Sequence, residues 1–300
     1  MTGNIDRFLL GDNPFIGVDH LSQERSRERR GGRLDSRTVS EIIDTALSHG
    51  AQGLVCSAHQ NIKSVLEFMR ETAHPKSFGI YLIVPDAQSH VRLASERGMI
   101  GLLTEVLGGL SLKKKAQVMI GGGFSTLIAD PRRIMKTYLD TEIFGFSKTL
   151  PINAKIKSVF LHELITELMV SFKMAELAHE YIDFTKGNLN VKPGFVTRNF
   201  ARFIDFADEA DLPMKEIVCL TPFNRVGFQM NPSRELCEDR LHRAKDISII
   251  AMSILAGGYL SIEDATAYIK NLRAEVSCVV GCSSKQHASE TFTILKRELS

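Results

Sequence analysis

The sequence lacks the features that would direct the protein out of the cytoplasm or into a membrane. Its amino terminus, MTGNIDRFLLGDNPF, has no basic region followed by a long apolar run and a small-residue cleavage site, so nothing marks it for secretion. The longest weakly polar stretch, AQVMIGGGFSTLIA, has about 14 residues and is rich in Gly. It is shorter than the roughly 20 residues that span a bilayer. We therefore expect a cytoplasmic protein that does not enter a membrane.

Cysteines are few and are not arranged as a disulfide framework. They are odd in number, and most lie inside apolar runs, which predicts buried thiols. The five are Cys56, Cys219, Cys237, Cys278 and Cys282. The Cys278 and Cys282 pair lacks the partners that a zinc finger needs at a fixed spacing, so we expect no structural zinc site there.

The sequence also lacks an excess of charge of one sign. There are 37 Lys and Arg against 35 Asp and Glu, and a formal net charge of +2 gives no general attraction to nucleic acid or to an anionic membrane. We expect neither as a partner. Arginines concentrate only in residues 23–37, QERSRERRGGRLDSR, which contain six of them against three acids. This segment is typical of a solvated, mobile loop, and the alternative is a lid whose arginines close over an anionic substrate.

Short apolar runs alternate with helical patterns along nearly the whole chain, which is typical of repeated βα units and a parallel sheet. The predicted strands are residues 8–18, 53–57, 78–84, 157–161, 191–196, 216–220, 247–253 and 276–281. Helical patterns cover residues 39–47, 60–73, 88–97, 164–182, 199–209, 232–244, 261–272 and 285–298. Eight such units favour a (β/α)8 barrel (a TIM barrel) that forms a single domain over residues 1–300, with a doubly wound open sheet as the alternative.

One connection is much longer than a single helix needs, because about 70 residues separate the third predicted strand from the fourth. Residues 99–150 are therefore expected to form a helical insertion within the barrel domain. The insertion could cover the pocket, form a subunit interface or pack as extra helices on the outer layer of the barrel. The sequence does not indicate the oligomeric state.

In barrels of this kind the active site forms where the carboxyl ends of the strands meet. Titratable side chains that follow predicted strands are therefore the catalytic candidates: His20, His59, His162 and Glu163. Because successive strand residues point to opposite sides, we expect His162 to face the pocket. Glu163 should point away from the pocket or lie behind His162 without contacting the ligand.

Amide and aromatic side chains near the same strand ends suit a small polar organic ligand. These substrate-binding candidates are Asn13, Phe15, Gln60, Asn224 and Asn231. His20, His59 and His162 are also of a type that binds divalent metal, and metal catalysis needs three protein ligands with one position open.

The last two βα loops contain a different signal. Gly257 and Gly258 follow the seventh predicted strand, and Ser283, Ser284 and Lys285 open the helix after the eighth. Glycines let backbone amides approach a ligand, and a helix N-terminus favours anions. This is the usual phosphate position in such barrels, while the alternative is that the glycines only form tight turns.

The second half of the chain resembles the aldo-keto reductase superfamily, a group of NADP-dependent (β/α)8 enzymes. KSVFLHEL resembles the fourth strand of that family, which ends in a histidine of the catalytic pocket, here His162. KPGFVTRNF resembles the fifth-strand segment ending in Ser-Asn-Phe, and this places Asn199 where the family binds the nicotinamide amide.

Two further segments extend the resemblance over about 145 residues. IIAMSILAGGYL, which includes Ser253, resembles the seventh-strand segment. VVGCSSKQHASET resembles the eighth, whose serine, basic residue and glutamate hold the adenosine phosphate end of the cofactor. The resemblance thus implies an NADP site that contains Ser283 or Ser284, Lys285 and Glu290.

The first half departs from the family pattern. In GLVCSAHQN, Val55 stands where the family has an aspartate, and Gln60 aligns approximately with its catalytic tyrosine. The lysine expected after the third strand is absent from IYLIVPDAQ, so His162 alone remains of the four catalytic residues. Without the tyrosine, ordinary carbonyl reduction lacks its proton donor.

Three functions follow from these patterns. The first is a divergent NADP-dependent oxidoreductase that acts on a small polar or anionic substrate and uses His162, with or without His59. The second is a metal-dependent hydrolase or lyase with the metal held by His20, His59 and His162 and with Glu163 or Asp86 as base. The third is a non-catalytic ligand-binding protein. Polar side chains at nearly every strand end favour an enzyme.

Overall fold

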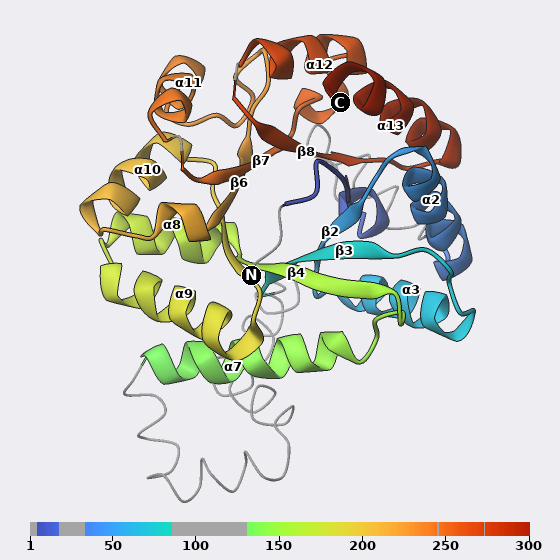
Figure 1. The fold of residues 1–300 in the computed structure, drawn as a ribbon, viewed down its shortest axis with the longest axis horizontal. Coiled ribbons are helices and arrows are strands. Elements are labelled where there is room, and N and C mark those ends of the chain that lie inside the picture. Colours follow the sequence, from blue (N-terminus) through green and yellow to red (C-terminus); the bar gives the residue numbers. More distant parts are fainter. Residues whose placement is uncertain (1–4, 18–33, 86–130, 245, 273) are drawn as a thin grey trace, which may run out of the picture.

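Eight parallel strands close into one barrel, with each strand hydrogen-bonded to the next and β8 to β1 (Figure 1). A computed structural model describes residues 5–17, 34–85, 131–244, 246–272 and 274–300. The strands are β1 (Phe8–Gly11), β2 (Gly53–Ser57), β3 (Phe78–Val84), β4 (Ala154–Leu161), β5 (Lys192–Val196), β6 (Val218–Pro222), β7 (Ser248–Met252) and β8 (Val276–Gly281). The predicted (β/α)8 fold is confirmed.

Helices surround this ring of strands (Figure 1). The described α-helices are α2 (Ser36–His49), α3 (Gln60–Glu71), α7 (Pro131–Ser147), α8 (Glu163–Ser171), α9 (Ala175–Leu189), α10 (Phe200–Glu209), α11 (Arg234–Arg243), α12 (Ile262–Asn271) and α13 (Lys285–Leu299). Three short 3-10 turns lie between them, η1 (Asn13–Phe15), η2 (Met214–Glu216) and η3 (Ala256–Gly258). No helix among the described residues is both long enough and apolar enough to cross a bilayer.

Two sets of buried side chains follow from the alternation along each strand. The smaller set fills the inside of the barrel and consists of Leu9, Val55, Tyr81, Phe160, Val196, Val218, Leu220, Ile250 and Val279. The larger set lies between strands and helices and takes the alternate strand residues, for example Leu10, Cys56 and Phe195. All five cysteines are buried free thiols, as the sequence predicts.

The bounds of β4, β5, β6 and β7 differ from the prediction by one to three residues, and two differences are larger. The first strand ends at Gly11 instead of continuing to residue 18, because Pro14 has no N–H for the sheet and the chain turns into η1. The helix predicted over residues 164–182 is two helices, α8 and α9, and Lys173 between them has a left-handed φ of 50°. The helix predicted over residues 88–97 lies outside the described residues.

The described part of the predicted insertion is helical. Helix α7 covers residues 131–147 and packs against α9, so the expected helical segment between the third and fourth strands is confirmed over this range. The rest of the insertion, up to residue 130, lies outside the described residues.

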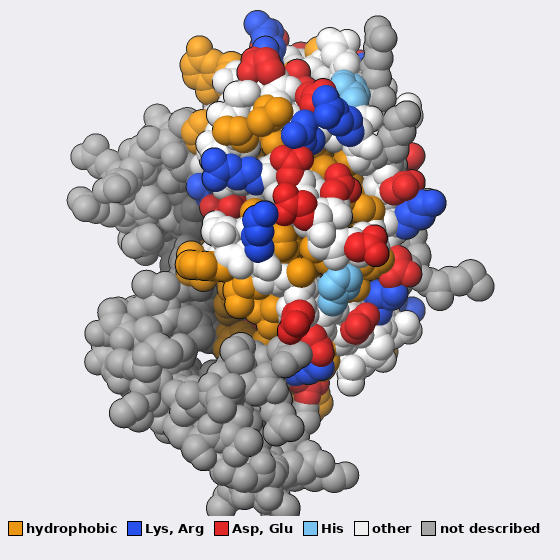
Figure 2. Space-filling view, turned by 90° about the vertical axis from the view of Figure 1, so that its left-hand side faces the viewer, with side chains coloured by type: hydrophobic (Ala, Val, Ile, Leu, Met, Phe, Trp, Pro, Cys, Tyr) orange, Lys and Arg blue, Asp and Glu red, His pale blue; other side chains and the backbone are white. Residues whose placement is uncertain are grey.

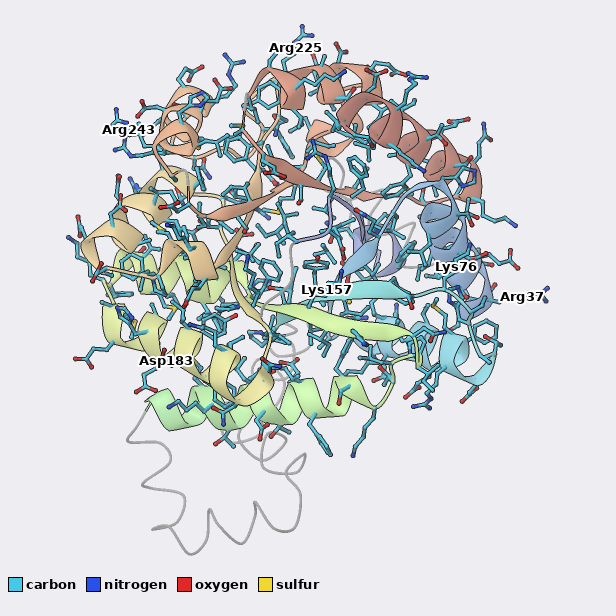
Figure 3. The ribbon with its side chains drawn as sticks, viewed as in Figure 1. Arg37, Lys76, Lys157, Asp183, Arg225 and Arg243 are labelled. Atoms are coloured by element: carbon cyan, nitrogen blue, oxygen red, sulfur yellow. The ribbon has the colours of Figure 1, made fainter. Side chains whose placement is uncertain are left out.

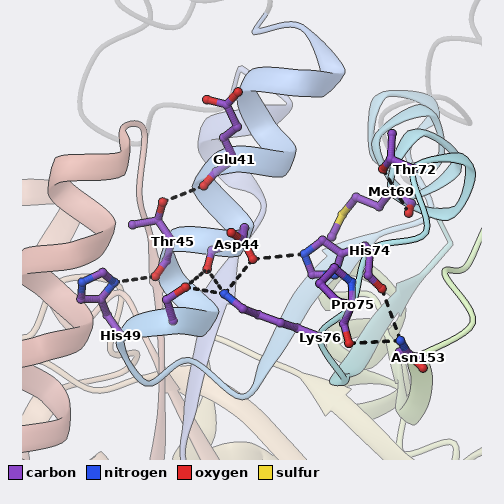
Figure 4. A network of polar contacts seen from close by, with 11 residues as sticks. Glu41, Asp44, Thr45, His49, Met69, Thr72, His74, Pro75, Lys76 and Asn153 are labelled. Atoms are coloured by element: carbon purple, nitrogen blue, oxygen red, sulfur yellow. Dashed lines mark hydrogen bonds and ion pairs between the residues drawn. The ribbon is translucent and has the colours of Figure 1, made fainter.

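A polar cluster joins consecutive βα units on the amino-terminal side of the barrel (Figure 4). Asp44 on α2 contacts Nε2 of His74 at 3.3 Å and Nζ of Lys76 at 2.8 Å, both in the segment between α3 and β3. Nδ2 of Asn153, just before β4, donates to the carbonyl oxygens of His74 at 3.3 Å and Pro75 at 3.2 Å. These contacts fix the entries of β3 and β4.

Acidic and basic side chains alternate across the face formed by α8, α9, α10 and α11, without a large patch of one sign (Figure 2). The predicted absence of a nucleic-acid partner remains a prediction.

The amino-terminal end of the barrel is closed by polar side chains. Nζ of Lys157 binds Oδ1 of Asp6 at 2.6 Å, and Lys157 lies near the centre of the ring (Figure 3). The hydroxyl oxygen of Tyr81 accepts a hydrogen bond from the Asp6 N–H at 2.7 Å. On the neighbouring side, Nζ of Lys192 lies 3.1 Å from Oγ of Ser248, and Lys192 is only 9% exposed.

Lys192→Met is expected to raise the free energy of unfolding by about 1 kcal/mol at pH 7. Burial lowers the pKa of the Lys192 ammonium, and among the described residues no carboxylate compensates it. Between this lowered pKa and about 10.4 the unfolded chain binds more protons than the folded protein, so the stability of the wild type rises with pH in that window. The advantage of Lys192→Met should therefore shrink towards pH 10, as measured by urea unfolding at both pH values.

Lys215, which is exposed, provides the control, because Lys215→Met should change the stability by less than about 0.5 kcal/mol at either pH. If the stability difference between Lys192→Met and the wild type stayed constant from pH 7 to pH 10, Lys192 would not be desolvated in the folded protein.

Candidate functional site at the barrel mouth

Two of the predicted catalytic histidines, His59 and His162, have the same structural role at the carboxyl ends of two strands. His59 follows β2 and caps α3, with its Nδ1 accepting the Asn61 N–H at 3.1 Å. His162 follows β4 and caps α8, with its Nδ1 accepting the Leu164 N–H at 3.2 Å. Since an acceptor nitrogen carries no proton, the neutral imidazole holds its proton on Nε2 in both residues. Each ring therefore presents Nε2–H as a donor.

The backbone holds His162 at the barrel mouth, the end where the carboxyl termini of the strands meet. The His162 N–H donates to the carbonyl oxygen of Val84 at 2.7 Å, which extends the β3–β4 pairing by one residue. His162 follows Phe160 by two residues, and Phe160 belongs to the set inside the barrel. This alternation supports the expectation that His162 faces the pocket.

Glu163 takes part in a group of polar side chains that the sequence did not predict. Its Oε2 lies 3.0 Å from Nε of Arg198, which is in the turn between β5 and α10. Glu167, one turn further along α8, lies beside the same turn. We call Glu163, Glu167 and Arg198 the rim cluster.

Glu167 binds three donors of the turn after β5. Its Oε1 accepts from Oγ1 of Thr197 at 2.7 Å and from the Arg198 N–H at 3.1 Å, and its Oε2 accepts from Nδ2 of Asn199 at 2.8 Å. Asn199, the predicted nicotinamide-binding residue, is therefore already oriented by a carboxylate. The bond uses its NH₂ group as the donor.

The pKa of the Glu163 carboxyl group is raised above its usual value. Burial is the main cause, because it disfavours the charged form. The guanidinium of Arg198 acts in the opposite direction, and the nearby carboxylate of Glu167 raises the pKa further. Glu163 therefore holds a proton more readily than an exposed glutamate does.

Asp12 is a second residue of the mouth that the sequence analysis missed. It follows β1, is buried, and its Oδ2 accepts from the N–H of Ser57 at 2.8 Å and from Oγ of Ser57 at 3.0 Å. Asp12 thus ties the end of β1 to the end of β2. The signal was its position in GDNPF, an acidic residue directly after an apolar run.

The predicted substrate-binding residues fall into different environments. Asn224 is buried and closes its own loop, with Nδ2 donating to the carbonyl oxygen of Phe228 at 2.8 Å and Oδ1 accepting the Phe228 N–H at 2.7 Å. Asn231 is exposed, and its N–H donates to the carbonyl oxygen of Arg198 at 2.9 Å. Phe15 is buried in the set between strands and helices.

Asn13 and Gln60 are exposed at the ends of β1 and β2. Their roles, like those of the other substrate-binding candidates, remain predictions.

The loop after β7 contains residues with positive φ, and its predicted role in binding phosphate remains a prediction. Gly257 and Gly258 have positive φ values of 74° and 99°, and no atom lies within 4 Å of a Cβ added to Gly258. Ser253 also has a positive φ, of 54°, and its Oγ lies 3.4 Å from Oε1 of Gln229. This loop therefore exposes backbone at the mouth.

Helix α13 begins directly after the loop that follows β8. Oγ of Ser284 accepts the His287 N–H at 3.1 Å and caps the helix, and Ser283 is exposed beside it. Lys285 Nζ binds Oε2 of Glu41 on α2 at 2.9 Å, and Glu290 accepts from Gln286 at 2.8 Å.

The sequence matches no family model, and no curated protein matches it. Solved structures do match. A protein from Pseudomonas aeruginosa assigned to the aldo-keto reductases has a TM-score of 0.57 at 12% identity, over 100% of this chain and 93% of that chain. The chain has the aldo-keto reductase fold.

Two further structures support this assignment of the fold. Glycerol dehydrogenase from Gluconobacter oxydans matches with a TM-score of 0.53 at 11% identity, over 100% of this chain and 94% of that chain. An aldo-keto reductase from Klebsiella pneumoniae in complex with NADPH matches with a TM-score of 0.51 at 10% identity, over 98% and 87% of the two chains.

Within this aldo-keto reductase fold, the positions of the missing catalytic residues are occupied by other side chains. Val55 lies inside the barrel, and Gln60 is the exposed first residue of α3. Neither Val55 nor Gln60 is an acid or a base.

The proposed metal site is only partly covered by the described residues. Within these ranges no group of three His, Cys, Asp or Glu side chains is placed to hold a metal ion. His20 and Asp86 lie outside the described residues, as does most of the arginine-rich segment 23–37. The metal-dependent function remains a prediction.

Proposed function

We propose that the protein is an NADP-dependent oxidoreductase that acts on a small polar carbonyl compound, or on the corresponding alcohol, at the barrel mouth. The observation that carries this proposal is the position of His162, whose Nε2–H is fixed as a donor at the end of β4. The aldo-keto reductase fold supports it, because one matching structure contains NADPH. The role of His162 would be to donate a hydrogen bond to the carbonyl oxygen.

The residues at the mouth fit a phosphate-bearing cofactor. The donor set at the start of α13 combines the N–H groups of its first turn other than that of His287, the hydroxyl groups of Ser283 and Ser284, and the ammonium of Lys285. The glycines after β7 add open backbone. NADP would supply or accept the hydride when bound, and Asn199 would contact its amide group.

The ion pair between Lys285 and Glu41 leaves Lys285 able to change partners. Both side chains are largely exposed, and pairs of this kind contribute at most about 1 kcal/mol. A phosphate group, with more charge and three acceptor oxygens, competes well for the same ammonium.

NADPH is expected to bind in the micromolar range, and Glu41→Gln should tighten this binding about threefold because it releases Lys285. Lys285→Met should weaken NADPH binding about tenfold, through the loss of a charge-assisted hydrogen bond. Both changes should be much smaller for NADH if Lys285 binds the phosphate that distinguishes the two cofactors. Fluorescence titration with NADPH and with NADH measures the affinities of the wild type, Glu41→Gln and Lys285→Met.

Lys270→Met is the matched control, because Lys270 forms a similar exposed pair with Glu298 near the other end of α13. It should leave both affinities unchanged. A folded wild-type protein that binds no NADPH at high micromolar concentration would contradict the proposed function. If Lys285→Met lost equal affinity for NADPH and for NADH, only the placement of Lys285 at the phosphate would be contradicted, and the proposed function would stand.

The proposal also covers the domain organisation, the partner and the place of action. The chain acts as a single barrel domain over residues 1–300, with the helical insertion of residues 99–150 within it. Its partner is a small-molecule substrate, and its place of action is the cytoplasm.

A further inference from the structure

The proposed reaction needs a proton as well as a hydride, and the residue that usually supplies it is replaced by Gln60. Besides His162, the carboxyl and imidazole side chains at the described part of the mouth are those of Asp12, His59, Glu163 and Glu167. Asp12 is bound by two donors of Ser57, and Glu167 by three donors of the turn after β5. Nδ1 of His59 caps α3.

Glu163 differs from these groups in its contacts. Within the described residues its carboxyl group has one partner, Nε of Arg198, and this partner binds Oε2. Oε1 has no partner among the described residues and can therefore carry a proton. Glu163 directly follows His162 and is the first residue of α8, so the alternation of β4 has ended before it, and its side chain lies beside the turn after β5.

Glu163 is also open to solvent on one side, with 28% of its side chain exposed. A proton that leaves Oε1 can be replaced from water without opening the barrel.

The rim cluster fixes Arg198 from three directions. Glu167 holds its N–H at 3.1 Å, the Asn231 N–H donates to its carbonyl oxygen at 2.9 Å, and its Nε faces Glu163. Glu167 also binds Thr197 and Asn199 on either side of it. Glu167 thus holds the backbone of the turn that carries Arg198, and the guanidinium of Arg198 lies beside Glu163.

We propose that Glu163 is the acid–base residue of this mouth, with Glu167 and Arg198 as its positioning residues. In the reduction, the hydride adds to the carbonyl carbon, and the electron pair of the C=O π bond takes the proton from Oε1 of Glu163. The alcohol and the Glu163 carboxylate are formed, and water returns the proton. This inference rests on the proposed oxidoreductase function.

The raised pKa of Glu163 has two causes that a variant can separate. Burial raises the pKa of Glu163, and the charge of Glu167 raises it further. Glu167→Gln removes the second cause and keeps a side chain of the same size. It should lower the pKa of Glu163. Because a loss of packing that exposed Glu163 would also lower this pKa, urea unfolding of Glu167→Gln checks that the packing is kept.

The first test is a titration of the carboxyl resonances by carbon-detected NMR on the full chain, with Glu163 assigned from Glu163→Gln. We expect Glu163 in the wild type to titrate above the usual glutamate value of about 4.3. In Glu167→Gln its midpoint should move to lower pH. Glu209→Gln, at an exposed glutamate paired with Lys173, should leave the midpoint unchanged.

The second test is the pH dependence of kcat/KM for NADPH-dependent reduction of a carbonyl substrate. Glu163→Gln should lower kcat/KM roughly 10²- to 10⁴-fold, without changing the Kd for NADPH, and Glu163→Asp should restore part of it. Activity of the wild type should fall as pH rises through the Glu163 midpoint, and Glu167→Gln should move this fall to lower pH.

The outcomes separate the two proposals. If NADPH does not bind, the oxidoreductase function fails, and the NMR titration still decides whether Glu163 holds a proton that depends on Glu167. A Glu163 midpoint at the usual value, or full activity in Glu163→Gln, would overturn the assignment of Glu163 even if NADPH binds.

Discussion

Gly194→Ala is expected to lower the free energy of unfolding by about 3 kcal/mol. Gly194 lies on β5, and a Cβ at this position would come within 2.3 Å of Cδ1 and 2.5 Å of Cε1 of Phe160. Phe160 is itself fully buried inside the barrel, so its ring cannot move aside without displacing neighbours. Urea unfolding of the two proteins measures the difference.

Two further variants make this prediction specific. Gly187→Ala, in α9, has no atom within 4 Å of the new Cβ and should stabilise the protein by about 0.5 to 1 kcal/mol. Phe160→Leu should relieve the clash, so that the double variant with Gly194→Ala shows a favourable coupling of about 1 to 2 kcal/mol. If Gly194→Ala unfolds at the same urea concentration as the wild type, the close contact between β4 and β5 is wrong.

His162→Asn is expected to lower kcat/KM for carbonyl reduction by about 10²- to 10³-fold while leaving the stability within about 0.5 kcal/mol of the wild type. The two effects separate because His162 has two roles. Its Nδ1 caps α8, and asparagine replaces this cap well, while nothing in asparagine replaces Nε2–H at the same position. The measurements are steady-state kinetics and urea unfolding.

His162→Ala should lose the same activity and, in addition, about 1 kcal/mol of stability, because alanine cannot cap α8. His59→Asn is the matched substitution at the equivalent cap of α3, and we expect a smaller loss of activity from it. Equal activity in His162→Asn and in the wild type would show that the imidazole has only its structural role.

The fold was predictable because the apolar residues form short continuous runs in the strands and recur at helical spacing between them. The bounds of β2, β3 and β8 agree with the prediction, since each is an apolar run between turn residues. The break between α8 and α9 was not predictable, because apolar residues continue across it and Lys173 is not a residue type that indicates a left-handed turn.

The site was predictable only as far as the ends of the strands indicate it. His59 and His162 were found because each directly follows an apolar run, although their role as helix caps was not, since histidine is not a preferred cap. The contacts of Glu167 with the turn after β5 join residues about 30 positions apart, and no spacing in the sequence indicates them.

The pair formed by Asp6 and Lys157 has a kinetic consequence. Together with Tyr81 it lies at the amino-terminal end of the barrel, and apolar side chains fill the inside, so a ligand bound at the mouth enters and leaves from the carboxyl-terminal side. Two ligands that use one entrance obstruct each other when the deeper one arrives second. The order of arrival should therefore be fixed: the ligand that sits deeper binds first and is released last.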